Sequence, residues 1–385
     1  MKFRILCPLI VLVLLISAFG KTDDHDNKKV VKLFKDCPEN IEVQVVGGQK
    51  GAVVDFNVPK ETVEYTVRQI EGLAPRDTFP VGTITNTYVA TNKLGDTDTC
   101  RFEIVIVASS KEVPFALQSG VPTPVGKVWK PVQALTDEFA GAALDETKWN
   151  IDPQGHSELN WTGRLPAIFQ RESFGWENGH LTIEAGQLPE PVTISPYGSP
   201  MTYKYYGGIL RSRVTSTIGN YYECRMKMNK TEMGGGFWLC HKGVCGKKHE
   251  IDITESVGCL TELTHDWAKR WDQIMHSNTI LRKTQCNEEE RSQGAAYPSQ
   301  KNHEKFFVYG FWWKSATELL FYLDGEHIYT VTPPVPFDEN LFMQFSIEAY
   351  DWNPIPETGS QVATASLADR TTYIDYIRTF QLVDE

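Results

Sequence analysis

The sequence lacks an excess of basic residues, and this absence excludes two classes of partner. Its 385 residues include 38 lysines and arginines against 49 aspartates and glutamates, which gives a formal net charge of −11. An acidic chain has no overall attraction to nucleic acid or to an anionic membrane surface. We therefore expect neither as a partner.

Long hydrophobic runs are missing after the N-terminus. The longest run, Ile5–Phe19, follows Lys2 and Arg4 and precedes a polar segment that begins at Lys21. This run is too short for a typical membrane-spanning helix, and basic residues before an apolar run are typical of a secretory signal peptide. Residues 1–20 are therefore predicted to be a signal peptide, with an uncleaved anchor as the alternative. The mature chain, of net charge −13, is predicted to be secreted and free of the membrane.

The sequence has few cysteines and no complete metal-binding pattern. Seven cysteines remain once the leader with Cys7 is removed, so at least one thiol is expected to stay free. Export permits disulfides, and Cys37 and Cys100 bracket one compact segment, so we predict that they pair. Cys240 and Cys245 lie near histidines, but no second Cys-x-x-Cys or histidine pair completes a tetrahedral zinc site. A local Cys240–Cys245 disulfide is the favoured prediction.

Helical periodicity is absent from the C-terminal 250 residues, and the chain is predicted to be all-β. Residues 30–108 contain short β-like runs separated by turns rich in Gly, Pro and Asp, which predict a small immunoglobulin-like sandwich. Residues 109–130 carry three prolines and no clear period, as is typical of a linker. Residues 131–385 contain recurring alternating segments and a hairpin signal at Asp324-Gly325. This pattern predicts one large antiparallel sandwich with few, short helices and a groove on its concave sheet.

Residues His249–Gly258 contain the pattern that bears most directly on function. Three acids, Glu250, Asp252 and Glu255, interrupt an apolar and β-branched run. In a regular strand the first two face one side and the third faces the other. An extra residue near Ile253-Thr254 would form a β-bulge and turn all three toward one face, and bulges are frequent next to active sites.

Three carboxylates on one face fit the chemistry of glycoside hydrolysis. Two carboxyl groups about 5 Å apart serve hydrolysis with retention of configuration. A solvated acidic strand face is the alternative explanation of such a charge run. The preceding Gly234–Leu239 and the following Gly258 favour catalysis, because glycines allow a flat substrate to approach a strand closely.

Further segments of the C-terminal part match the pattern of one enzyme family. They are Asp137–Phe139, Leu144–Trp149, Trp161–Phe169, Phe237–Leu239, Glu250–Glu255, Trp312–Lys314, Glu348–Pro354 and Tyr373–Arg378. Together they resemble glycoside hydrolase family 16 over essentially all of residues 131–385, and within it the β-agarases and β-porphyranases that degrade red-algal galactans. The resemblance implies a β-jelly roll with a substrate cleft across its concave face.

The N-terminal part resembles a different module. The segments that match are Asp36–Pro38, Phe79–Gly82, Tyr88–Thr91 and Asp98–Phe102. They are similar to the hyalin-repeat (HYR) module, an immunoglobulin-like extracellular domain. The resemblance implies a spacer or adhesion role and assigns no catalytic residue.

The family resemblance assigns a role to each acid of the motif. It implies that Glu250 is the nucleophile, and that Glu255 protonates the departing oxygen and then activates water. Asp252 would support catalysis by hydrogen bonding to Glu250. Repulsion by the two other carboxylates is expected to raise the pKa of Glu255.

Six further residues are predicted to bind the sugar chain. The aromatic rings would stack on sugar faces, and the polar groups would hydrogen-bond hydroxyl or sulfate groups. Core packing is the alternative role for the tryptophans, and a lone histidine is more often structural. The six residues are Trp161, Arg164, Trp238, His276, Glu348 and Trp352.

No cofactor is expected for catalysis. The family resemblance implies a structural calcium on the convex face, far from the acids, with Asp375 as a carboxylate ligand.

Three functions are weighed for the chain. The leading hypothesis is a secreted, monomeric endo-β-agarase that cleaves β-1,4 bonds of agarose with retention. The first alternative is a β-porphyranase acting on sulfated porphyran, for which Lys242, Lys247 and Lys248 would supply a cationic pocket. The second is a non-catalytic galactan-binding lectin with the HYR-like module as its stalk, although a lectin has no need of all three acids.

Overall fold

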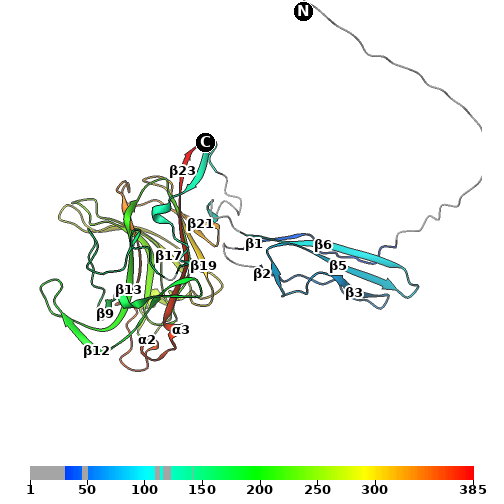
Figure 1. The fold of residues 1–385 in the computed structure, drawn as a ribbon, viewed down its shortest axis with the longest axis horizontal. Helices are drawn as coiled ribbons and strands as arrows, with labels where there is room; N and C mark the ends of the chain where they lie inside the picture. The colour runs from blue at the N-terminus through cyan, green and yellow to red at the C-terminus, as the bar shows by residue number, and fades with distance from the viewer. Residues whose placement is uncertain (1–30, 46–50, 109–112, 116–122, 142) are drawn as a thin grey trace, which may run out of the picture. The chain divides into compact units, whose positions relative to one another are not determined.

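A computed structural model describes residues 31–45, 51–108, 113–115, 123–141 and 143–385 (Figure 1). They fall into two units, the first formed mainly by Gly51–Ile106 and the second mainly by Val107–Glu385. The predicted signal peptide, residues 1–20, lies outside the described residues. Within the described ranges, no helix is long and apolar enough to cross a membrane.

The first unit is a small β-domain, as predicted. Phe79, Phe102 and Ile104 alternate with exposed neighbours and are each at most 2% exposed, so they form its core. The predicted disulfide between Cys37 and Cys100 is confirmed, with Cα atoms 5.6 Å apart. The main sheet has the order β1 (Ile41–Val45), β6 (Thr97–Ala108), β5 (Gly82–Asn92) and β3 (Tyr65–Glu71), and β2 (Gly51–Val53) pairs with β4 (Thr78–Pro80).

The second unit contains two large sheets that share one core, which confirms the predicted sandwich (Figure 1). Neighbouring described strands are antiparallel, except that β9 and β13 are parallel. The sheet that carries the cleft has the order β12 (Gly186–Ile194), β13 (Met201–Ser216), β22 (Leu341–Glu348), β15 (Gly234–Cys240), β16 (His249–Val257), β17 (Met275–Leu281) and β18 (Glu290–Ala296), with β8 (Trp149–Asn150) and β9 (Ala167–Phe169) beside β13.

The second sheet of this unit lies on the other side of the core. Its order is β10 (Phe174–Glu177), β11 (His180–Glu184), β23 (Thr371–Asp384), β14 (Tyr221–Lys227), β19 (Phe307–Trp313), β20 (Leu319–Leu323) and β21 (Glu326–Val331), with β7 (Lys127–Pro131) beside β23. The described helices are short, as predicted. They are η1 (Gln133–Leu135), η2 (Arg171–Ser173), η3 (Asp266–Ala268), α2 (Gln361–Thr364) and α3 (Leu367–Arg370).

Alternation along the central strands separates the core from the cleft. Phe237 and Phe345 face inward and stack with ring centroids 4.6 Å apart, whereas their neighbours Trp238 and Gln344 line the cleft. The inward residues pack against the other sheet, and burying a large apolar side chain contributes about 1.5–3 kcal/mol. The glycines of β15 allow close strand approach, because a Cβ on Gly235 would lie 1.7 Å from a backbone oxygen of β22. The cleft floor is therefore fixed by a packed core.

Candidate active site

Strand β16 contains the β-bulge that the acidic motif predicted. Against β15, Phe237 pairs with Thr254 but the next residue, Trp238, pairs with Asp252, so Ile253 has no partner. The ladder between β16 and β17 shifts over the same interval. The side chain of Ile253 is fully buried in the core. The bulge is confirmed, and it re-aims the residues that follow it.

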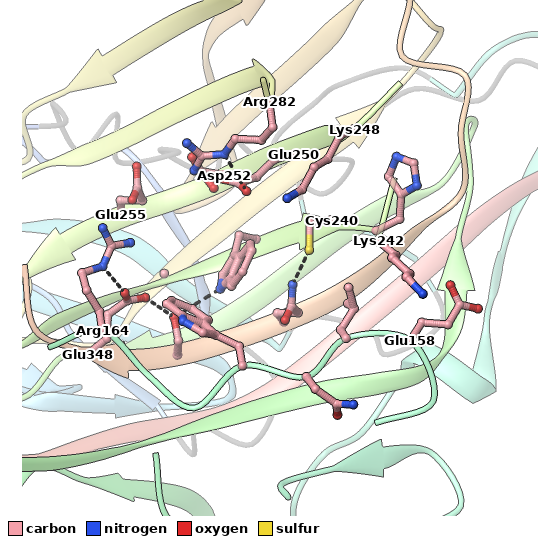
Figure 2. Close-up of a pocket in the computed structure, with 18 of the residues that line it drawn as sticks. Glu158, Arg164, Cys240, Lys242, Lys248, Glu250, Asp252, Glu255, Arg282 and Glu348 are labelled. Atoms are coloured by element: carbon pink, nitrogen blue, oxygen red, sulfur yellow. Dashed lines mark hydrogen bonds and ion pairs between the residues drawn. The ribbon is translucent and has the colours of Figure 1, made fainter. Parts of the chain in front are cut away.

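The bulge brings the three acids of the motif to one side of the sheet. Glu250, Asp252 and Glu255 all line one cleft (Figure 2). The side chains of Glu250 and Glu255 are 13% and 21% exposed, and Asp252 is almost fully buried. Carboxylates so sheltered from water interact strongly with each other and with nearby cations.

The cleft extends to both sides of the acids. Two hollows of about 400 and 600 Å³ share five lining residues, which include Asp252, Glu255 and Arg282, so they form one continuous cleft. The hollow of 400 Å³, called here the Trp161 half, also contains Trp161, Trp238, Lys242, Lys248 and Glu250. The other, called the Trp267 half, also contains Trp267, Trp271, His276, Tyr297 and Trp352.

Glu250 is held by an arginine that the sequence analysis missed. Arg282 Nε donates to Glu250 Oε2 at 3.1 Å, and Arg282 Nη2 donates to Glu250 Oε1. Arg282 Nη1 donates to Glu289 at 3.2 Å. Burial opposes a charged guanidinium, but the charge of Glu250 outweighs it and raises the pKa of Arg282. Arg282 is the first residue after β17, and its only sequence signal was a basic residue next to a strand end.

The protonation of the other two acids differs from the prediction. Burial, together with the charges of Glu255 and Glu250, raises the pKa of Asp252 well above its ordinary value. For Glu255, burial is outweighed by the hydrogen bond and charge of His276 and by the hydrogen bond from Asn278, which lower its pKa. Asn278 Nδ2 lies 2.9 Å from Glu255 Oε2, and His276 Nδ1 lies 3.6 Å from the same atom. The predicted rise for Glu255 was wrong, because of these two carboxyl groups it is Asp252 whose pKa is raised.

Four of the predicted sugar-binding residues lie together in the Trp161 half. Trp161 and Trp238 meet edge to face with centroids 6.1 Å apart. Arg164 Nε donates to Glu348 Oε2 at 2.8 Å, and Ser346 Oγ donates to Glu348 Oε1 at 2.9 Å. Glu348 is buried but paired, and it faces the cleft as expected. The two rings and the guanidinium form one wall of the cleft.

The two remaining predicted residues lie in the Trp267 half. His276 contacts Glu255 as described and packs on Trp271, with ring centroids 4.3 Å apart. Trp352 follows β22, which ends at Glu348, and packs on Trp271 at 4.6 Å and on Trp267 at 5.3 Å. Glu348 and Trp352 therefore line adjacent halves of the same cleft.

Trp267 and Tyr297 are binding-site candidates that the sequence did not indicate. They are 61% and 49% exposed, although large aromatic side chains are usually buried. Both line the Trp267 half, and Arg270 lies over the Tyr297 ring at 3.8 Å. Trp267 belongs to the short helix η3 in an irregular segment, where no periodicity marks which residues face a cleft.

Asp375, the residue implied as a calcium ligand, lies in an ion pair. It lies on β23, where Arg225 Nη1 donates to Asp375 Oδ2 at 2.7 Å and His180 Nε2 lies 3.7 Å from Oδ1. The Arg225 guanidinium thus occupies one oxygen of the carboxylate, where a calcium ion would need oxygen ligands. Among the described residues, no group of three or more His, Cys, Asp or Glu could hold a metal ion.

The predicted Cys240–Cys245 disulfide was wrong. Cys245 instead pairs with Cys286, with Cα atoms 5.4 Å apart. Cys240 is the last residue of β15, and strand alternation turns its thiol toward the cleft, where Gln344 Nε2 donates to Cys240 Sγ at 2.8 Å. Cys224, Cys240 and Cys259 are free, so the expectation of at least one free thiol is confirmed.

Comparison with known families gives two matches. The family described as "Beta-porphyranase A-D, GH16 domain" matches residues 129–382, and the HYR domain matches residues 33–106.

Similar proteins with assigned activities include β-porphyranases and β-agarases. β-Porphyranase B of Zobellia galactanivorans is 41% identical over 73% of this chain and 94% of its own length. β-Porphyranase B of Phocaeicola plebeius is 33% identical, covering 68% of this chain and 87% of its own. A β-agarase of P. plebeius is 24% identical over 68% and 87% of the two chains. The crystal structure of Z. galactanivorans porphyranase B superposes with a TM-score of 0.63 at 40% identity, covering 72% of this chain and all of that one.

Proposed function

Because the chain belongs to the glycoside hydrolase family 16 group of β-porphyranases A–D, and is therefore a glycoside hydrolase of the galactanase kind, we propose that it is an endo-β-porphyranase. Its substrate would be sulfated porphyran, cleaved at β-1,4-galactosidic bonds with retention of configuration. Agarose was the leading hypothesis from the sequence, but the β-porphyranases described above are more similar to this chain than the β-agarase is.

The observation that carries the proposal is the position of the acids midway along an open cleft that also holds unpaired lysines. Lys242 and Lys248 line the Trp161 half, and neither forms an ion pair with any described residue. Cations without carboxylate partners are available to a sulfate group. Lys247 is not available to a sulfate group, because its Nζ lies 3.0 Å from Asp338 and 2.8 Å from Glu339. Lys242 and Lys248 thus favour a sulfated galactan.

The proposed mechanism assigns a role to each acid. Glu250 attacks the anomeric carbon and forms a glycosyl-enzyme, while Glu255 gives its proton to the departing glycosidic oxygen. Water then releases the sugar, and Glu255 recovers a proton from that water. The raised pKa of Asp252 supports its part, since only a protonated Asp252 can donate a hydrogen bond to ionised Glu250.

Glu255 must take up a proton before the first step. In the free protein His276 and Asn278 lower its pKa and favour the anion. A bound sugar excludes water from the cleft, and loss of water disfavours a charged carboxylate. Substrate binding is therefore expected to promote protonation of Glu255.

The test compares porphyran before and after chemical desulfation, together with agarose, carrageenan and laminarin. New reducing ends should form fastest from native porphyran, and Lys242→Ala/Lys248→Ala should slow that reaction while leaving hydrolysis of desulfated porphyran unchanged. Equal rates on native and desulfated porphyran would overturn the sulfate preference. Product from laminarin alone would overturn the galactan assignment.

Secretion and a monomeric state are part of the same proposal. The apolar leader at residues 1–20 and the HYR match at residues 33–106 support export, with the HYR module as a spacer. Expression of the full chain should give a product in the medium that begins after residue 20. Its elution volume on size exclusion should correspond to one chain.

A further inference from the structure

Arg282 binds Glu250 with two parallel hydrogen bonds, and this geometry restricts the orientation of the carboxylate. The contacts from Nε and Nη2 engage one oxygen each, a bidentate arrangement that favours a shared plane for the carboxylate and the guanidinium. Each oxygen keeps a second lone-pair direction in which it can approach an anomeric carbon. Without Arg282, the carboxylate of Glu250 would lose both of these hydrogen bonds.

The other groups around Glu250 do not reproduce this restraint. Asp252 precedes the bulge on the same strand, and Cys240 lies opposite Glu250 on β15. Lys248 lines the same half of the cleft, but no hydrogen bond joins it to Glu250 among the described residues. A lysine would in any case offer a point charge and not a planar fork.

Arg282 is itself held by a network in the loop between β17 and β18. Its backbone N–H donates to Lys248 O at 2.8 Å, and its carbonyl accepts from Asn287 Nδ2 at 3.1 Å. Thr284 Oγ1 donates to Asn287 Oδ1 and accepts from Cys286 N at 3.1 Å. Every member of this network is within five residues of Arg282, except Lys248 on the neighbouring loop.

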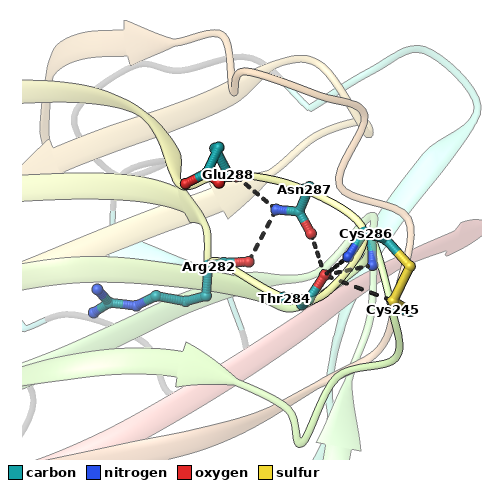
Figure 3. The surroundings of a disulfide bond; sticks show 7 residues. Cys245, Arg282, Thr284, Cys286, Asn287 and Glu288 are labelled. Atoms are coloured by element: carbon teal, nitrogen blue, oxygen red, sulfur yellow. Dashed lines mark hydrogen bonds between the residues drawn. A yellow bond between two sulfur atoms is a disulfide. The ribbon is translucent and has the colours of Figure 1, made fainter.

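The disulfide ties these two loops together (Figure 3). Cys245 belongs to the loop between β15 and β16, and Cys286 to the loop between β17 and β18. Gly246 N, next to Cys245, donates to Thr284 Oγ1 at 3.1 Å. The sulfur bridge and this hydrogen bond therefore converge on the turn that follows Arg282.

We propose that Arg282 is a positioning residue for the nucleophile Glu250, and that the Cys245–Cys286 disulfide keeps Arg282 in place. This inference rests on the proposed glycosidase function. The competing explanation is that Arg282 only neutralises a half-buried carboxylate and so contributes to folding. The two explanations differ in what they predict for turnover in a folded variant.

The first experiment measures kcat and KM of Arg282→Ala and Arg282→Lys on porphyran. A lost charge-assisted pair should lower kcat by roughly 10- to 100-fold with little change in KM, and lysine should restore only part of the loss. Free guanidinium ions at a non-denaturing concentration should partly rescue Arg282→Ala. An unchanged kcat, or a loss that follows thermal stability and is not rescued, would overturn the proposal.

The second experiment tests whether the disulfide acts through Arg282. Cys245→Ser/Cys286→Ser should lower kcat several-fold, and the matched variant Cys37→Ser/Cys100→Ser, in the other unit, should leave kcat unchanged. Adding Cys245→Ser/Cys286→Ser to Arg282→Ala should lower kcat no further, because both changes remove the same restraint on Glu250. Additive losses would refute the disulfide's role.

Assay of the wild-type chain in parallel distinguishes failure of the positioning role from failure of the proposed function. If it cleaves porphyran and Arg282→Ala does so equally well, only the positioning role fails. If the wild type cleaves none of the galactans, the proposed function fails and the positioning role falls with it.

Discussion

Replacing Glu223 by glutamine should remove a pH dependence from the stability of the second unit. Glu223 lies on β14 and is fully buried. Burial raises its pKa to about 7, against the opposing effects of the Arg378 charge, 3.8 Å away, and of the Phe115 N–H, which donates to Glu223 Oε2 at 2.8 Å. A carboxyl group in an unfolded chain titrates near 4.3.

The direction of the pH effect on stability follows from proton binding in the folded and unfolded states. Between about pH 4.5 and 7 the folded chain holds a proton on Glu223 that the unfolded chain has lost, so the free energy of unfolding falls as pH rises through this window. The pKa difference of about 2.7 between the two states corresponds to about 3 to 4 kcal/mol. Glutamine is neutral at every pH and can still accept a hydrogen bond from Phe115 N. The free energy of unfolding of Glu223→Gln should therefore not fall over this pH window.

Calorimetric melting of the full chain between pH 4.5 and 8 checks the prediction. Glu223→Gln and wild type should melt alike at pH 4.5, and the variant should melt higher at pH 8, by roughly 6 °C for a unit of this size. The exposed Glu326→Gln, on the same sheet, serves as the control and should follow the wild type. A difference between Glu223→Gln and wild type that is constant with pH would refute a buried proton at Glu223.

Three further predictions concern the cleft. Glu250→Ser should lower kcat by roughly 10⁴-fold or more, because no carboxylate remains to form the glycosyl-enzyme. Calorimetric titration should show that this variant still binds oligosaccharide. Full activity would remove Glu250 from the nucleophile role. Asp252→Asn keeps a hydrogen-bond donor and should lose about 10-fold in kcat, while Asp252→Ala should lose about 100-fold; equal losses would contradict a protonated Asp252. Trp267→Ala should raise KM for long porphyran chains by about 2- to 10-fold through lost ring contact, with no effect on chains too short to reach the Trp267 half; an unchanged KM for long chains would exclude Trp267 from binding.

Local patterns made the strand-level features predictable. The two-residue period of strands and the odd spacing between Glu250 and Glu255 were sufficient to require a bulge near Ile253, and the register shows it there. The bulge depends on neighbours along the chain, which a sequence displays directly. The Cys37–Cys100 disulfide spans 63 residues and was predicted only because the two cysteines bracket one compact segment.

Features that depend on contacts between distant loops could not be predicted in this way. Arg282 reaches Glu250 only because β17 pairs with β16, and Cys286 reaches Cys245 only because the same pairing places two loops side by side. The pKa of Glu255 was misjudged because His276 and Asn278 come from that neighbouring strand. Predicting any of these contacts requires knowing which strands are neighbours in the sheet.

The unpaired Ile253 has a consequence for transplanting this chemistry to other scaffolds. If the ten residues from His249 to Gly258 were grafted onto a sheet whose strands match residue for residue, Glu255 would point between the two layers, where an unpaired carboxylate costs several kcal/mol. A recipient sheet must therefore offer flanking strands that are one residue shorter over this interval. The capacity for hydrolysis belongs to three adjacent strands together, and copying the acidic segment alone would destabilise its new host.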